Sequence, residues 1–185
     1  MLCIASACLS APLVWADTEF ITLVLEGDSA PGLAAGFSGF DAPLLAGGHY
    51  AFSAYTGFSG SASNPLRTAL FNGSGATFQS LWLNSDEAPG APGTHFRLAP
   101  NGFAPSRVTQ ISADGSLAFT GELTGSGVNS TLSDSLNQRG VWSTTFGALA
   151  LEMRSNDAAP AFGAGWRFSL PGSVALNKNN DIAFW

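Results

Sequence analysis

The sequence predicts an all-β protein, a β-propeller-like array of about three four-stranded antiparallel blades in an open ring. Short motifs recur in one order, with the Ala-Phe pair returning after 67 and then 65 residues. The apolar segments are short and separated by Gly/Ser-rich turns, which favours strands over helices. Four antiparallel strands per repeat are typical of a propeller blade, and typical propellers have four or more blades.

Three motifs define the repeat. The first is Asp-x-Ala-Pro at Asp28, Asp86 and Asp157. The second is an Ala-Phe pair, found at Ala51-Phe52, Ala118-Phe119 and Ala183-Phe184. The third is a small residue followed by an aliphatic and an aromatic, found at Ala69-Leu70-Phe71 and Gly140-Val141-Trp142. An aromatic is expected near the ninth position after each Asp, where Phe37, His95 (beside Phe96) and Trp166 stand.

The middle repeat predicts its strands in order. Residues 108–111 are a short apolar strand, and Asp and Gly in 113–115 suit a tight turn. Residues 117–120 return, and 140–144 form the third strand. Residues 149–153 alternate aliphatic with other residues, which indicates a half-buried fourth strand.

The connections follow from composition. Residues 53–66 and 121–138 are polar and Gly/Ser/Asn-rich, so we expect long loops between second and third strands. Residues 87–105 hold four prolines and predict an irregular connection. Residues 20–25 precede the first Asp-x-Ala-Pro, where a unit's last strand is expected.

The segments 112–119 and 177–184 resemble the NxxGxxAF motif of bacterial exported "choice-of-anchor" tandem-repeat proteins. Two further segments, GVW at 140–142 and NDAAP at 156–160, resemble other parts of that repeat. The turn and returning strand within 112–119 also resemble TolB-type propeller repeats. The resemblance implies an exported, surface-associated protein and carries over no catalytic residue. The residues assigned to the repeat motif are Ala51, Phe52, Asp114, Gly115, Ala118, Phe119, Trp142, Asn177, Asn180, Ala183 and Phe184.

Residues 1–16 are expected to be a signal peptide, because 2–15 are apolar and Val14-Trp15-Ala16 fits a cleavage site. Both cysteines, Cys3 and Cys8, would leave with it. Residues 17–185 then form one β-repeat domain, with units near 28–86, 86–157 and a partial 157–185. We expect the sequence to be a fragment whose open ends expose strand edges to association.

Charge and motif content narrow the function classes. The net charge is −6 and the seven basic residues are scattered, so a nucleic-acid partner is not expected. His49 and His95 stand at different repeat positions, so a zinc site is not expected either. No transmembrane segment is expected in the mature chain.

Two recurring residue sets each allow two interpretations. Asp28, Asp86 and Asp157 could bind calcium, but an Asp before Ala-Pro more simply caps a turn. The recurring aromatics Phe52, Phe71, Phe119, Trp142 and Phe184 could stack on sugars, but core between blades is the preferred interpretation.

The sequence therefore predicts an exported bacterial surface or periplasmic protein that acts as a non-catalytic binding or structural module. A protein or glycan partner would contact the loop face, and no cofactor is expected beyond the calcium alternative. The second hypothesis is an extracytoplasmic propeller hydrolase acting on glycans, with acidic residues gathered from distant positions.

Overall fold

The computed structural model describes residues 22–57, 67–84, 86–97, 109–129 and 136–185. These residues form antiparallel β-sheets, with one short 3-10 helix at Pro160–Phe162. The all-β prediction is confirmed. Among these residues there is no helix with the length and apolar character needed to span a membrane. The predicted signal peptide, 1–16, lies outside the described part of the chain.

The first sheet contains five strands, β1 (Phe37–Phe40), β2 (Leu44–Ala46), β3 (His49–Thr56), β4 (Arg67–Ser74) and β5 (Thr77–Leu83). β1 and β2 both pair with β3, at opposite ends of one edge, and the sheet continues through β4 to β5. The sheet is therefore four positions wide, with its first position divided between two short strands.

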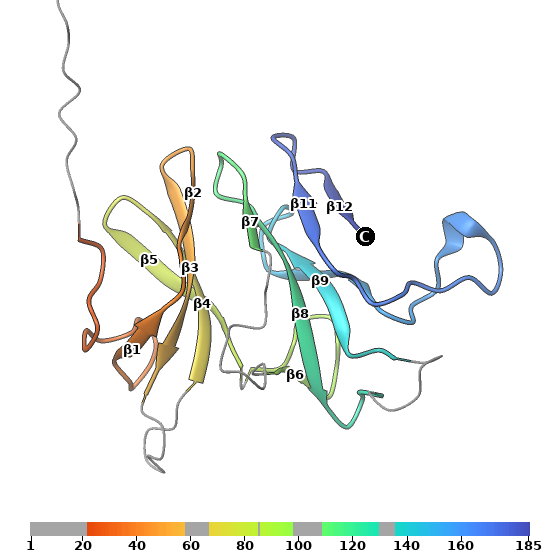
Figure 1. The fold of residues 1–185 in the computed structure, drawn as a ribbon, viewed down its shortest axis with the longest axis horizontal. Coiled ribbons are helices and arrows are strands. Elements are labelled where there is room, and N and C mark those ends of the chain that lie inside the picture. The colour runs from red at the N-terminus through yellow and green to blue at the C-terminus, as the bar shows by residue number, and fades with distance from the viewer. Residues whose placement is uncertain (1–21, 58–66, 85, 98–108, 130–135) are drawn as a thin grey trace, which may run out of the picture.

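The second sheet has the same plan, with β6 (Thr94–Phe96), β7 (Thr109–Ile111), β8 (Leu117–Gly125), β9 (Arg139–Ser143) and β10 (Ala150–Arg154). β6 and β7 divide one edge of β8, and β9 and β10 follow on the other side. A third, two-stranded sheet pairs β11 (Val174–Leu176) with β12 (Ile182–Phe184). Figure 1 shows the three sheets one after another along the longest axis.

Matched residues stand opposite each other in the two large sheets. Phe52 pairs with Phe71 across β3 and β4, and Phe119 pairs with Trp142 across β8 and β9. Each last strand also carries a one-residue bulge, which skips Leu81 in β5 and Glu152 in β10. A bulge re-aims the residues that follow it, and here it turns Trp82 and Met153 into buried positions.

The core has three parts, divided by the two large sheets. One cluster lies between the large sheets and joins Leu70 and Trp82 to Phe96, Phe119 and Trp142. A second covers the other side of the first sheet and contains Phe37, Phe52 and Phe71. A third joins Val141 and Met153 of the second sheet to Val174 and Phe184 of the third.

The core prediction therefore holds for three aromatics and needs correction for two. Phe119 and Trp142 are buried between sheets, and half-buried Phe184 packs against the second sheet. Phe52 and Phe71 are also buried, but on the side of the first sheet that faces away from the second. Among the described residues they pack within the first sheet and against Leu23, Val24 and Leu33, not against a second sheet.

Several strand limits differ from the sequence predictions. The second strand of the middle repeat runs to Gly125 instead of ending at 120, and β3 runs to Thr56, so both predicted loops are shorter. The stretch 87–105 was predicted to be irregular, but it contains β6, which begins beyond the Gly93 turn. Residues 22–25 are not a strand, and the loop segments 58–66 and 130–135 lie outside the described residues.

Candidate functional site

The three recurring Asp side chains close identical turns. The Oδ2 atoms of Asp28, Asp86 and Asp157 accept the backbone N–H of the residue three positions earlier, at 2.8, 3.0 and 3.0 Å. The backbone N–H of each Asp donates to the carbonyl of that same earlier residue. One carboxylate oxygen of each is thus used inside its own turn.

These turns provide no shared metal site in the described part of the chain. No group of three or more His, Cys, Asp or Glu side chains able to hold a metal occurs among those residues. A calcium ion needs six to eight oxygens, and each Asp here stands in a separate turn. The turn interpretation of the recurring Asp accounts for the geometry that the structure shows.

The same turns align a different aromatic from the one that the spacing indicated. Isolated bridges join residues 29 and 36, 87 and 95, and 158 and 167. The aromatic after each bridge is Phe37, Phe96 or Phe168. The separation between the Asp and this aromatic thus grows from nine residues in the first repeat to eleven in the third. The predicted alignment on His95 and Trp166 is therefore corrected to Phe96 and Phe168.

The hairpin turns of the three sheets lie side by side at one end of the molecule (Figure 1). A Cβ on Gly47, in the β2–β3 turn, would lie 2.1 Å from the carbonyl oxygen of Ala113 in the β7–β8 turn. A Cβ on Gly115 would lie 2.6 Å from Nδ1 of His49. Both glycines have positive φ, 56° and 87°, so only glycine fits the space and the backbone there.

Asp114 connects the second turn to the third. Its carboxylate accepts the Ser112 hydroxyl, the Ser116 N–H at 3.0 Å and the Asn180 side-chain amide at 2.8 Å. The Ser112 hydrogen bond, then those from Asn180 and Ser116, hold the pKa of Asp114 well below its usual range. Asn180 itself adopts a positive φ of 65°, which places its amide toward Asp114.

A groove of about 400 Å³ opens at this end, between the first sheet and the β7–β8 turn. We call it the turn-end groove. Its lining residues are His49, Asn72, Gly73, Ser74, Thr77, Phe78, Gln79, Asp114 and Gly115. Amides, hydroxyls and an imidazole dominate this lining. The Phe78 ring packs against Phe37, Phe52 and Phe71 on the other side of the sheet.

Beside the groove lies one buried acceptor that the protein leaves unpaired. The Oδ1 atom of Asn72 is buried and makes no hydrogen bond within the protein. A buried acceptor without a partner costs free energy, commonly about 1–3 kcal/mol, unless a ligand or water satisfies it. The one carboxylate in the lining, Asp114, already accepts three hydrogen bonds.

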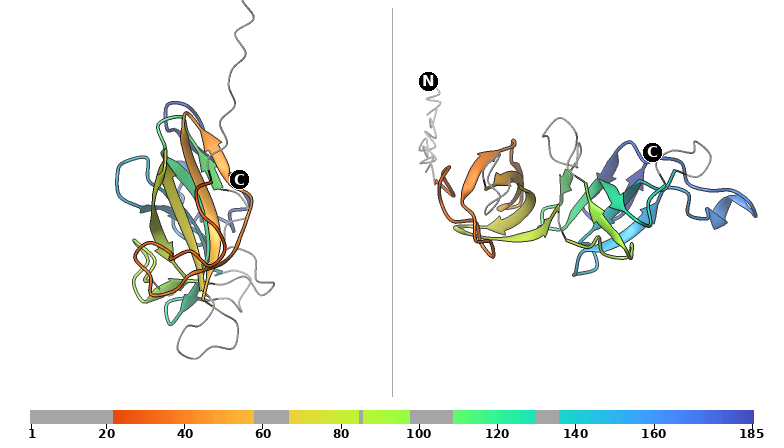
Figure 2. Two further views of the ribbon diagram at one scale, coloured as in Figure 1. Left: turned by 90° about the vertical axis from the view of Figure 1, so that its left-hand side faces the viewer. Right: turned by 90° about the horizontal axis from the view of Figure 1, so that it is seen from below.

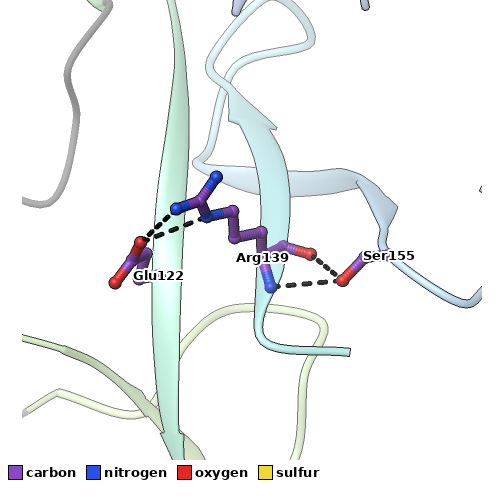
Figure 3. A network of polar contacts seen from close by, with 3 residues as sticks. All are labelled: Glu122, Arg139 and Ser155. Atoms are coloured by element: carbon purple, nitrogen blue, oxygen red, sulfur yellow. Dashed lines mark hydrogen bonds and ion pairs between the residues drawn. The ribbon is translucent and has the colours of Figure 1, made fainter. Parts of the chain in front are cut away.

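A polar network lies on the opposite side of the second sheet, toward its other end. Arg139 Nη2 lies 2.7 Å from Glu122 Oε1, across neighbouring strands, and Arg139 Nε donates to the same oxygen. The Ser155 hydroxyl accepts the backbone N–H of Arg139 and donates to the backbone carbonyl of Arg139 (Figure 3). These contacts join β8, β9 and the end of β10, so the network stabilises the sheet.

The sequence indicated Asp114 and Gly115 and missed the rest of the groove. Asn72 and Gln79 belong to strands whose amides follow no motif, and His49 was considered only as an isolated imidazole. The groove also lies at the hairpin end, whereas residues 57 and 126–129, the described parts of the two predicted loops that directly follow β3 and β8, lie at the far ends of those strands. Only the contact between two turns distant in sequence creates the groove.

A family model described as "Family of unknown function (DUF7453)" matches residues 12–185. No curated protein and no solved structure gives a match to the chain.

Proposed function

We propose that this chain, which belongs to the DUF7453 family, is a non-catalytic binding module of the bacterial cell surface or periplasm, assembled from tandem β-units. The turn-end groove is the binding site in this proposal, and a glycan chain is its ligand class. The observation that carries the proposal is the lining of the groove: neutral amides and hydroxyls with a single carboxylate.

The chemistry of the groove matches a neutral, hydroxyl-rich ligand. The Asn72 and Gln79 amides are groups that can donate and accept, and the Thr77 hydroxyl, which donates to the Ser74 carbonyl, can accept. The Phe78 ring packs against Phe37, Phe52 and Phe71 on the other side of the sheet, so recognition in the groove would rest on its polar groups.

The same lining supports binding over hydrolysis. Glycoside hydrolysis by the common mechanism uses two carboxyl groups about 5–9.5 Å apart. The groove is lined by a single carboxylate, and its hydrogen bonds keep it ionised and engaged. The alternative function, an extracytoplasmic glycan hydrolase, receives no support from this groove.

The unit architecture supports the structural part of the proposal. The two large sheets share strand order, bulge position and Asp turn, and β11 and β12 correspond to β7 and the start of β8. Successive units pack face to face, as blades of a propeller do. The proposed location outside the cytoplasm rests on the predicted signal peptide, residues 1–16. Fractionation of cells that express the tagged chain would test this location.

Binding can be tested on the purified chain with defined neutral oligosaccharides, cellotetraose, maltotetraose and chitotetraose, by isothermal titration calorimetry. At least one should bind, and Asn72→Ala and Gln79→Ala should each weaken it about tenfold, which is 1.4 kcal/mol. Thr124→Ala, an exposed change at the far end of β8, is the matched control and should not alter binding.

Three results would count against the proposal. Absence of binding to all three sugars would remove the ligand class, and binding that ignores both groove variants would remove the site. Release of new reducing ends from a bound oligosaccharide would favour the hydrolase. Thermal unfolding of each variant must accompany the titration, since Asn72 is half-buried.

A further inference from the structure

The turn-end groove contains one full negative charge, the carboxylate of Asp114. The other ionisable side chain in its described lining is His49, and that lining includes no Lys or Arg. Within the part of the chain that the structure describes, no Lys or Arg forms a salt bridge with Asp114. The charge of Asp114 is therefore not balanced by a basic side chain of the protein.

The hydrogen bonds of Asp114 leave one acceptor position open. An ionised carboxylate has about four such positions, two on each oxygen. The Oδ1 atom accepts two hydrogen bonds, from the Ser112 hydroxyl and from the Ser116 N–H at 3.0 Å. Among the described residues, Oδ2 accepts one, from the Asn180 side-chain amide at 2.8 Å. Because Asp114 is exposed, the second position on Oδ2 is available to a ligand.

The same three hydrogen bonds hold the carboxylate in place. Their donors come from two turns, residues 112–116 before β8 and residues 177–181 before β12, so Asp114 is fixed from two sides. A group that is already fixed loses little conformational entropy when a ligand binds. The bonds also lower the pKa of Asp114, which keeps the carboxyl ionised. The groove thus presents a fixed charge rather than a mobile one.

A fixed negative charge distinguishes between classes of glycan. An ammonium group would gain a charge-assisted hydrogen bond and the attraction of the opposite charge, whereas a hydroxyl would gain the hydrogen bond alone. A carboxylate on the ligand would be repelled, and the net charge of −6 acts in the same direction over a longer distance. The expected order of affinity is amino glycan, then neutral glycan, then acidic glycan.

We propose that the turn-end groove selects a glycan that carries primary ammonium groups, one of which donates to Oδ2 of Asp114. The hydroxyls of the same glycan contact the neutral amides and hydroxyls of the lining. Neutral glycans bind more weakly, through their hydroxyls alone. This inference rests on the proposed function of the groove and adds to it the charge of the ligand.

The probes are glucosamine tetraose, cellotetraose and tetragalacturonate, titrated into the purified chain by isothermal titration calorimetry at pH 6.5. The first two have the same linkage and differ at one carbon of each sugar, where an amine replaces a hydroxyl. Glucosamine tetraose should bind about threefold to fivefold more tightly than cellotetraose, the range expected for an exposed ion pair. Tetragalacturonate should bind most weakly, and 1 M sodium chloride should remove most of the difference between the first two.

Asp114→Asn in the full chain is the decisive variant. It removes the charge and keeps nearly the same side-chain shape, so glucosamine tetraose and cellotetraose should then bind equally. Glu26→Gln is the matched control, because it changes the net charge by the same amount at an exposed residue near the start of β1, at the other end of the first sheet. This control should keep the full advantage of glucosamine tetraose. Unfolding temperatures of both variants show that they are folded, and the comparison of sugars on the wild-type chain needs no variant.

Each result assigns a different conclusion. Equal affinity of the wild-type chain for glucosamine tetraose and cellotetraose would overturn this inference and leave the proposed function standing. An advantage of glucosamine tetraose that survives Asp114→Asn would also overturn it, since attraction to the whole acidic protein would then be the cause. Absence of binding to every sugar, charged or neutral, would contradict the proposed function and this inference with it.

Discussion

The two large sheets share one strand plan but bury their aromatic sides in different ways. In the second sheet, Phe96 and Phe119 pack against Trp82 of the first sheet. In the first sheet, the ring centroids of Phe37 in β1 and Phe78 in β5 are 6.1 Å apart, although these strands stand at opposite edges of the sheet. The first sheet therefore curls over its own aromatic side, as the view from below in Figure 2 shows. One strand pattern thus supports an interface or a self-contained core.

The comparison extends to the small residues beneath the rings. Ala54 and Ala69 of the first sheet correspond to Gly121 and Gly140 of the second, and all four are buried. A Cβ on Gly140 would lie 2.7 Å from the Trp142 ring and 2.9 Å from the Met153 carbonyl oxygen. The larger indole thus requires glycine where the phenyl ring of Phe71 leaves room for alanine.

The largest effect should come from removing Trp142. Its side chain is fully buried between the sheets, and Nε1 donates to the Pro89 carbonyl at 3.0 Å. Trp142→Ala should lower the free energy of unfolding by about 3–5 kcal/mol, measured by urea denaturation, and Phe119→Ala by a similar amount. Phe71→Ala is the matched change in the first sheet and should cost less, because it breaks no hydrogen bond. Near-neutral effects of Trp142→Ala and Phe119→Ala would contradict an interface core.

Substitution of Gly140 should come next. Gly140→Ala should destabilise by about 1–3 kcal/mol through overpacking. In a double-mutant cycle, Trp142→Phe should recover part of that cost, since the second sheet would then resemble the first. Ala69→Gly is the reverse change and should cost about 1 kcal/mol. Strict additivity of Gly140→Ala and Trp142→Phe would show that the indole is not the cause.

The strands and turns of the fold could be predicted because each depends on local chemistry. Alternation of Leu149, Leu151 and Met153 indicated β10, and Asp114-Gly115 indicated the turn before β8. β6 was missed because Thr94-His95-Phe96 is a short strand among prolines, where only pairing with Leu123 and Thr124 makes it a strand. The direction in which Phe52 and Phe71 face was missed for a related reason: alternation defines two sides but not which neighbour covers each.

The groove depended even more on tertiary contacts. Asp114 carries a recognisable turn signal, but its bond to Asn180 spans 66 residues. Asn72 and Gln79 acquire a shared role only because the turn that joins β4 to β5 lies beside the Gly115 turn. Sequence spacing therefore located the turns and could not locate the space between them.

A smaller effect is expected at the Glu122–Arg139 pair. These residues stand where the first sheet has Tyr55 opposite Thr68, a pair without charge. The Arg139 and Glu122 side chains are 38 and 26% exposed, so the coupling free energy should be about 0.2–1 kcal/mol. A double-mutant cycle with Glu122→Gln and Arg139→Gln should show it, and 1 M salt should reduce it. A coupling well above this range would mean that the pair is more desolvated than its exposure indicates.

The smallest effect at neutral pH, and the most specific, is expected from Asp114. Its hydrogen bonds from Ser112, Asn180 and Ser116 lower the pKa of the folded carboxyl, whereas the unfolded value is near the usual value of about 3.9. A lowered folded pKa means that the stabilisation is complete above the unfolded pKa and is lost as pH falls toward the folded one. Asp114→Asn should therefore reduce the unfolding temperature slightly at pH 7, and the gap to wild type should narrow steadily below pH 4. Every other carboxyl is present in both proteins, so the difference between the two profiles isolates this group. A gap that stays constant from pH 7 to pH 2 would contradict the role of Asp114 in joining the second and third turns.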